Sequence, residues 1–224
     1  MTTKPTSSTS SRAPRAKIKT RKYHGGSLDD GEFDAGHKGK RFEDFVTHEY
    51  CCKANLFRPH VLALRLYTSS SYPCFNNHLR KNTKTSHPFK MSVYYLNEAI
   101  KLLRFVAAEE FPDYFEEVSL WRGIRDMAIM EEFMKKGGTE MAPMFTSRDQ
   151  TVAFKYPASQ TPPVFHYRAK ALMQGVSIEF LSLYPKEKEY LYPPLTYFSP
   201  LGRDEEVHDG KIYHVLIVTP QIST

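Results

Sequence analysis

Two glutamates one residue apart, Glu187 and Glu189, are the first candidates for chemistry in this sequence. They lie in the segment YPKEKEYLYPP, where a charged loop runs into an apolar stretch typical of a strand. On a strand, residues two apart point to the same face, about 7 Å apart along the chain. Repulsion between two such carboxylates raises the pKa of one or both, which suits a general base or a group that stabilises positive charge. The same spacing also fits a solvated turn in which Lys186 and Lys188 neutralise the glutamates.

Two further segments carry polar side chains beside predicted elements. In SLWRGIRD, Arg122 ends a predicted strand and Gly123 permits close backbone approach. A guanidinium at a strand end can bind phosphate through two parallel hydrogen bonds. In APMFTSRDQTVAF, Thr146 and Ser147 precede a short predicted helix, where they could orient a ligand. Each feature also has a plainer interpretation, because Arg122 could pair with an acid such as Asp126, and Thr146 or Ser147 could cap the helix.

The formal charge of +6 is concentrated in residues 1–24. This segment holds seven lysines and arginines and no acid, whereas the other 200 residues hold 24 basic and 25 acidic side chains. The basic tail predicts attraction to nucleic acid, to an anionic membrane or to an acidic protein. Two other interpretations stay open, a solvated arm and an organellar transit peptide.

Several classes of protein are excluded by what the sequence lacks. No apolar run approaches the roughly 20 residues that a transmembrane helix needs, and no secretory signal follows the basic residues. The protein is therefore expected to be cytoplasmic or otherwise intracellular. Its three cysteines predict no disulfide framework and show no zinc-ligand spacing, so no metal is expected. A Rossmann-type nucleotide fingerprint is also missing.

Helical patterns precede strand patterns along the chain. Residues 1–40 read as a basic tail and linker, and residues 41–224 as a single domain. Helices are predicted from Val61 and over Met91–Ala108, where apolar residues recur every three or four positions. One later helix is predicted over Met127–Lys136. Strands are predicted in EVSLWRG, PPVFHYRAK, GVSIEFLSLY, EYLYPPLTYF and KIYHVLIVT. The order predicts an α+β fold with a mainly antiparallel sheet.

Taken in order, the segments LWRG, MFTSRDQTVAF and YPKEKEYLYPP resemble the R-S-E class of mono-ADP-ribosyltransferases, the cholera-toxin-like enzymes, in their eukaryotic arginine-directed form. The segment ALRLYTSSSYPCFNNHLR is similar to the helical region that precedes the core in eukaryotic members. The resemblance covers about residues 63–219. It implies an ADP-ribosyltransferase-like fold, with N-terminal helices packed on a split sheet, and NAD as co-substrate.

The resemblance also implies roles for individual residues. Glu189 would stabilise the positive charge that develops on the ribose, and Glu187 would accept a hydrogen bond or proton from an incoming guanidinium, so that ADP-ribose passes to an exposed arginine of an acceptor protein. Arg122, with Gly123 beside it, would bind the phosphates or adjacent ribose of NAD. The pair Thr146-Ser147 would support the nicotinamide pocket, and Tyr184 would stack on the acceptor.

One position departs from the family pattern. Phe145 stands where the first serine of a Ser-Thr-Ser segment is expected, and it would obstruct NAD if its ring pointed into the pocket. If the motif is shifted by a residue or two, Ser147 supplies the hydroxyl. Two alternative functions stay open, an NAD glycohydrolase with water as acceptor, and a degenerate member that acts as a binding module.

Overall fold

The structure of this protein, a computed structural model, describes residues 34–81, 85–124, 131–155 and 163–222. The basic residues 1–24 therefore lie outside the described residues, and so does the first part of the helix predicted from Met127. The packed region begins before residue 41, because the backbone N–H of Asp34 donates to the carbonyl of Leu183 (2.6 Å) and His37 is buried.

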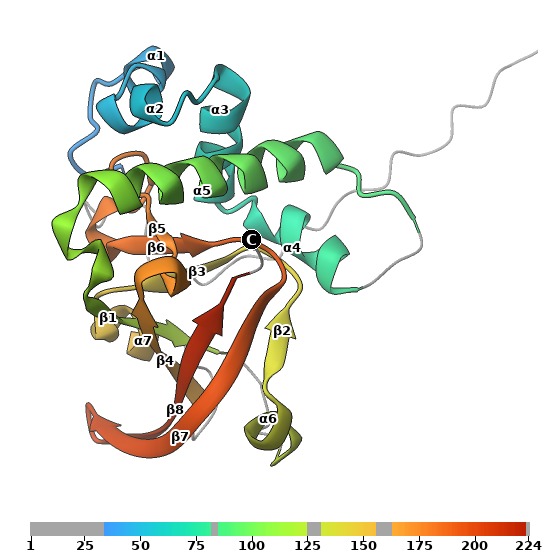
Figure 1. The fold of residues 1–224 in the computed structure, drawn as a ribbon, viewed down its shortest axis with the longest axis vertical. Helices are drawn as coiled ribbons and strands as arrows, with labels where there is room; N and C mark the ends of the chain where they lie inside the picture. The colour runs from blue at the N-terminus through green and yellow to red at the C-terminus, as the bar shows by residue number, and fades with distance from the viewer. Residues whose placement is uncertain (1–33, 82–84, 125–130, 156–162, 223–224) are drawn as a thin grey trace, which may run out of the picture.

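The N-terminal half of the described chain is helical, and its helices gather at one end of the molecule (Figure 1). Apolar residues at helical spacing form their core: Leu96, Ile100, Leu103 and Val106 on the longest helix are all buried against α3 and its neighbours. Both helices predicted in this half are confirmed. The elements are α1 (Phe42–Val46), α2 (Glu49–Lys53), α3 (Arg58–Tyr67), α4 (Tyr72–Arg80), α5 (Lys90–Glu110) and a 3₁₀ turn at Pro112–Phe115.

The rest of the described chain forms one eight-stranded sheet in the order β2-β7-β8-β4-β1-β3-β6-β5. Only the β4–β8 pairing is parallel, so the predicted α+β fold with a mainly antiparallel sheet is confirmed. The strands are β1 (Glu117–Gly123), β2 (Gly138–Glu140), β3 (Met144–Ser147), β4 (Pro163–Lys170), β5 (Val176–Ser177), β6 (Glu189–Tyr192), β7 (Thr196–His208) and β8 (Lys211–Gln221). Helices α6 (Glu131–Lys136) and α7 (Gln150–Lys155) and 3₁₀ turns at Ala171–Met173 and Pro185–Glu187 lie between them.

One predicted strand is much shorter than expected. The segment GVSIEFLSLY contributes only the two residues of β5, because the carbonyl of Ile178 accepts hydrogen bonds from the backbone N–H groups of Leu181 (3.1 Å) and Ser182 (2.8 Å). These bonds close a turn, which removes the following residues from the sheet. The side chains of Leu181 and Ser182 are nevertheless fully buried.

Three apolar clusters hold the layers together. The first joins α3 and α5 to β5 and β6, and includes Leu191. The buried residues of the second cluster, which includes Leu120 and Tyr167, all come from strands. The third cluster packs α7 against Trp121 of β1. Strands β3 and β6 contribute residues to both the first and the second cluster.

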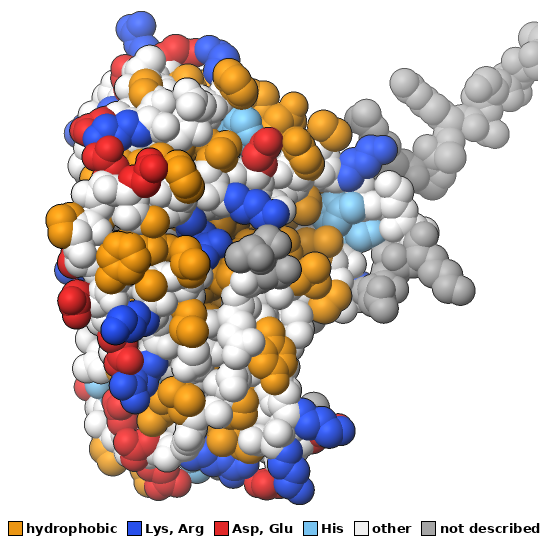
Figure 2. Space-filling model, viewed as in Figure 1, with side chains coloured by type: hydrophobic (Ala, Val, Ile, Leu, Met, Phe, Trp, Pro, Cys, Tyr) orange, Lys and Arg blue, Asp and Glu red, His pale blue; other side chains and the backbone are white. Residues whose placement is uncertain are grey.

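The outer surface mixes hydrophobic side chains with charged side chains of both signs on the face shown in Figure 2. Among the helices that the structure describes, none is long and apolar enough to cross a membrane.

The packing of α5 makes a direct prediction about stability. Ile100 is fully buried, whereas Phe105 on the same helix is 63% exposed. Replacing Ile100 with Ala should lower the free energy of unfolding by about 2–5 kcal/mol, because it removes buried methyl groups and leaves a cavity. The matched control, Phe105→Ala, should cost less than about 1 kcal/mol in the same urea titration. Equal losses for the two variants would contradict the described orientation of α5.

Candidate active site

Adjacent strands bring two of the predicted site residues together. Ser147 at the end of β3 is the cross-strand partner of Glu189 at the start of β6, and on its other side it pairs with Trp121 of β1. Directly opposed residues of antiparallel strands have their Cβ atoms about 4.5–5.5 Å apart. A hydroxyl and a carboxylate are thus fixed next to each other by the backbone ladder.

Glu189 is a buried carboxylate that accepts a hydrogen bond from a neighbouring serine side chain. Only 7% of the residue is exposed, and its Oε2 accepts a hydrogen bond from the Ser182 hydroxyl at 2.5 Å. Burial raises the pKa of Glu189 to about 8, the hydrogen bond from Ser182 lowers it, and the charge of Glu187 raises it further. Desolvation is thus the main cause of the raised pKa, and the repulsion between the two glutamates expected from the sequence is a smaller contribution.

Glu187 does not share a strand face with Glu189, contrary to the simplest interpretation of their spacing. Glu187 ends the 3₁₀ turn Pro185–Glu187, and Lys188 adopts a left-handed conformation with φ of 45° before β6 begins. The alternation of side chains along a strand therefore does not reach back to Glu187. This carboxylate is half-buried, in contrast to the nearly enclosed Glu189.

The Ser147 hydroxyl connects β3 to the segment of residues 185–188 that precedes Glu189, here called the glutamate loop. It donates to the backbone carbonyl of Glu187 at 2.5 Å and accepts from the backbone N–H of Asp149 at 2.9 Å. The start of α7 is capped by the Asp149 carboxylate, which accepts from the backbone and hydroxyl of Thr151. The expected capping role thus belongs to Asp149, while the Thr146 hydroxyl donates to the carbonyl of Tyr190 (3.2 Å).

Phe145 points into the helical core. It pairs with Leu191 across the β3–β6 ladder, and its ring lies on the buried ring of Tyr67 with a centroid distance of 4.7 Å. The ring of Phe145, two residues from Ser147 along β3, therefore packs against α3.

Arg122 makes a different set of contacts from Ser147 and Glu189. Trp121 is in register with Ser147, so strand alternation directs Arg122 away from Trp121. Its Nη2 lies 3.8 Å from Glu140 Oε2, and the same carboxylate accepts two hydrogen bonds from Arg80, at 3.0 and 2.9 Å. Burial opposes ionisation of Glu140, yet Arg80 and Arg122 outweigh it and hold its pKa below the ordinary value.

The sequence analysis did not predict two of these site residues, Arg80 and Ser182. Arg80 is the last residue of the helical segment that carried the family resemblance, so a signal for it was present. Ser182 carried no signal, because a lone serine between apolar residues is unremarkable. The suggested partner of Arg122, Asp126, lies outside the described residues.

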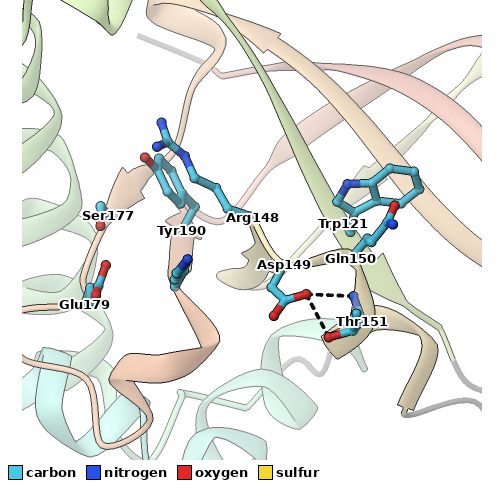
Figure 3. Close-up of a pocket in the computed structure, with 9 residues that line it drawn as sticks. Trp121, Arg148, Asp149, Gln150, Thr151, Ser177, Glu179 and Tyr190 are labelled. Carbon is cyan, nitrogen blue, oxygen red and sulfur yellow. Dashed lines mark hydrogen bonds between the residues drawn. The ribbon is translucent and has the colours of Figure 1, made fainter. Parts of the chain in front are cut away.

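A polar pocket of about 710 Å³ opens beside the glutamate loop (Figure 3). Arg148 lies over the ring of Tyr190, with 5.1 Å from the guanidinium carbon to the ring centroid, on the opposite side of the pocket from Asp149 and Thr151. Arg122, Ser147 and Glu189 do not line it. The lining residues are Trp121, Arg148, Asp149, Gln150, Thr151, Ser177, Glu179, Lys188 and Tyr190.

No group of three or more His, Cys, Asp or Glu side chains that could hold a metal ion occurs within residues 34–81, 85–124, 131–155 and 163–222.

Comparison of the sequence with protein families gives one match. Residues 33–214 match the family model of the NAD:arginine ADP-ribosyltransferases. A comparison with curated proteins found no match.

Solved structures of bacterial ADP-ribosyltransferases have a similar fold. HopU1 of Pseudomonas syringae pv. Tomato DC3000 aligns with a TM-score of 0.62 and 18% identity, over 80% of this chain and 86% of that one. Plx2a, a toxin from Paenibacillus larvae, aligns with a TM-score of 0.59 and 18% identity, over 80% and 94% of the two chains. Exoenzyme S from Pseudomonas aeruginosa, solved with human 14-3-3 protein beta and bound to carba-NAD, aligns with a TM-score of 0.51 and 21% identity, over 79% and 86%.

The raised pKa of Glu189 predicts how stability depends on pH. Its folded pKa of about 8 exceeds the ordinary value of 4.5, so the wild-type protein loses stability as pH rises from about 4.5 through 8. Glutamine does not titrate. The variant Glu189→Gln should therefore match wild type near pH 4.5 and exceed it by a few kcal/mol near pH 9, as measured by urea unfolding across that range.

The exposed Glu109 on α5 supplies the matched control. Glu109→Gln should track wild type at every pH. A stability difference between Glu189→Gln and wild type that stays constant from pH 4.5 to 9 would show that Glu189 titrates in the folded protein as it does in the unfolded chain.

Proposed function

This chain belongs to the NAD:arginine ADP-ribosyltransferase family, whose enzymes use NAD, and we propose that it is a mono-ADP-ribosyltransferase of the R-S-E class and the eukaryotic arginine-directed type. In this proposal it transfers ADP-ribose from NAD to an arginine side chain of an acceptor protein and releases nicotinamide. The observation that supports it most directly is the placement of Glu189. Its carboxylate is buried, is opposed to Ser147 on the neighbouring strand, and lies two residues from a second glutamate.

Glu189 is suited to stabilise a cation at the ribose. When the bond between the nicotinamide nitrogen and ribose C1′ breaks, the electron pair leaves with neutral nicotinamide and positive charge develops on the sugar. A fixed carboxylate in a site that excludes water stabilises this charge more than it stabilises the ground state. Ser147 holds the loop that precedes Glu189 through its hydrogen bond to the carbonyl of Glu187.

The raised pKa of Glu189 is consistent with NAD as co-substrate, because NAD carries a positive charge on its nicotinamide ring. In the NAD-free protein the carboxyl is largely protonated at neutral pH, because its pKa lies near 8. The nicotinamide ring of NAD is cationic and favours the ionised form of a nearby carboxylate. Binding of NAD would therefore release a proton from Glu189 and leave the charged form that the reaction needs.

Glu187 would receive the acceptor. It is half-buried at the end of a 3₁₀ turn, so its carboxylate is more accessible than that of Glu189. The guanidinium nitrogen that attacks ribose C1′ loses a proton, and Glu187 would accept it. We assign the approach of the acceptor to the neighbouring pocket, because Lys188 and Tyr190 line it and the carboxylates of Asp149 and Glu179 suit a guanidinium.

Arg122 and Arg80 together would hold the pyrophosphate of NAD. Their guanidinium groups converge on one carboxylate, that of Glu140, so the fold already places two permanent cations side by side. Arginine binds phosphate oxygens through paired hydrogen bonds. Gly123 and Thr146 flank Arg122 and Ser147 in sequence, and we retain them as residues that shape the NAD site. Carba-NAD is bound in the structure of exoenzyme S, which shares the fold.

The two glutamates can be separated by substitution. Glu189→Gln should suppress both ADP-ribose transfer and NAD hydrolysis by about a hundredfold or more, because it removes the charge that stabilises the sugar cation. Glu187→Gln should suppress transfer to arginine more than hydrolysis, because water does not need the guanidinium base. Both activities can be measured with labelled NAD and a small arginine ester as acceptor, as bound label, free ADP-ribose and released nicotinamide.

The wild-type enzyme in the same assay decides between the alternative functions. Free ADP-ribose without labelled acceptor would identify an NAD glycohydrolase. An unchanged NAD pool, together with binding of an acidic protein or a nucleic acid through residues 1–24, would identify a binding module. Full activity of Glu189→Gln would remove Glu189 from the reaction.

The arginine pair predicts effects on NAD binding. Arg122→Lys and Arg80→Lys should each raise the KM for NAD by about tenfold or more, because lysine cannot make the paired hydrogen bonds. Arg168 offers a matched control, since its guanidinium pairs with Glu117 in the same two-bond manner on the surface of β4. Arg168→Lys should leave the KM unchanged, and an Arg122→Lys variant with the same KM as this control would contradict the assignment.

A further inference from the structure

Ser182 makes a contact with Glu189 that the family match does not explain. Its side chain is fully buried, and its hydroxyl lies 2.5 Å from Glu189 Oε2. The hydroxyl oxygen of Ser182 also accepts a hydrogen bond from the backbone N–H of Tyr184 at 3.0 Å. Because a hydroxyl has one proton, and this oxygen already accepts a bond on its other side, the proton is directed at the Glu189 carboxylate.

The turn that carries Ser182 is tied to the backbone of Glu189 as well. The backbone N–H of Ile178 donates to the carbonyl of Glu189 at 3.1 Å. The carbonyl of Ile178 then accepts from the backbone N–H of Ser182 at 2.8 Å. These bonds form a closed ring from Glu189 through Ile178 and Ser182 back to the Glu189 side chain, so the distance between the hydroxyl and the carboxylate is fixed at both ends.

Helix α3 and its C-terminal cap hold this turn from the other side. Arg65 donates from Nη1 to the carbonyl of Leu181 at 2.9 Å, and the Thr68 hydroxyl accepts from the backbone N–H of Leu183 at 3.2 Å. The two contacts bracket Ser182. Arg65 also pairs with Asp34 (3.1 Å), whose backbone N–H donates to the carbonyl of Leu183. The helical layer thereby fixes the position of the serine.

From these contacts we propose that Ser182 is a positioning residue for Glu189, held in place by Arg65 and Thr68, and that it directs the carboxylate toward the reacting ribose. The catalytic consequence rests on the proposed function, whereas the coupling between the two side chains does not. Ser182 donates to the ionised carboxylate and so favours it, while Glu187 is the charged group that disfavours it from the adjacent 3₁₀ turn. Removing the hydroxyl should leave Glu189 protonated to a higher pH.

The coupling can be measured without an activity assay. The stability difference between Glu and Gln at position 189, followed by urea unfolding from pH 4.5 to 10, reports the folded pKa of Glu189. In the Ser182→Ala background this difference should keep growing to a pH about one unit higher than in the wild-type background. The same curve in both backgrounds would overturn the coupling.

The catalytic role has its own measurement. The pH profile of kcat/KM for NAD reports the free enzyme, and for Ser182→Ala it should move about one unit toward alkaline pH, with a loss of about tenfold at pH 7. An alkaline shift in the stability curve without a shift in this profile would overturn the catalytic role and leave the coupling intact. Loss of all activity in Glu189→Gln with no shift in Ser182→Ala would do the same.

A second variant covers the case in which Ser182→Ala does not fold. Thr68→Val keeps the volume of a buried side chain and removes the acceptor for Leu183. It should shift both curves in the same direction by a smaller amount. Ser69→Ala is the matched control, because within the described residues this neighbouring hydroxyl bonds with Leu66 and Ser71 of its own segment. A shift of equal size in the control would show a general effect of loosening α3 and would overturn the proposal.

Discussion

The burial of the Glu189 carboxylate is the constraint on which the candidate site depends. A carboxylate that is almost entirely removed from water is costly to ionise, and its pKa rises accordingly. The Ser182 hydroxyl limits that cost because it donates to the carboxylate, whereas the negative charge of the neighbouring Glu187 adds to it. The carboxyl consequently favours its neutral form at neutral pH, and a nearby cationic ligand would favour the charged form.

Residues of the helical layer contact the segments that carry Ser182, Ser147 and Arg122. Arg65 and Thr68 hold the turn that carries Ser182. Tyr67, between them, donates its buried hydroxyl to the carbonyl of Pro143 just before β3, and Arg80 on α4 binds Glu140 beside Arg122. The C-terminal ends of two helices, α3 and α4, therefore contact the turn beside the Glu189 carboxylate, the start of β3 and the arginine pair. The helices are therefore part of the candidate site, because their side chains hold its segments in position.

Local sequence patterns predicted the regular elements well and the loops poorly. The apolar spacing of α5 and the segment EVSLWRG gave nearly the observed boundaries, because burial of one face is already encoded in the order of residues. The turn after β5 was read as strand, because its residues are apolar and the hydrogen bonds of Ile178 that close the turn leave no mark in the sequence. The left-handed Lys188 was equally invisible, and it separates Glu187 from the strand that carries Glu189.

The sequence by itself determined the α+β class, the order of helices and strands, and the three motifs in which chemistry is expected, since these depend on residue type and local spacing. Only the tertiary structure decided which side chains meet. The register of β3 against β6 places Ser147 opposite Glu189, the turn after β5 brings Ser182 to the carboxylate, and α4 adds Arg80 to Arg122. Burial and long-range contact set the pKa of Glu189, and both arise from residues distant in the chain that the folded core brings together.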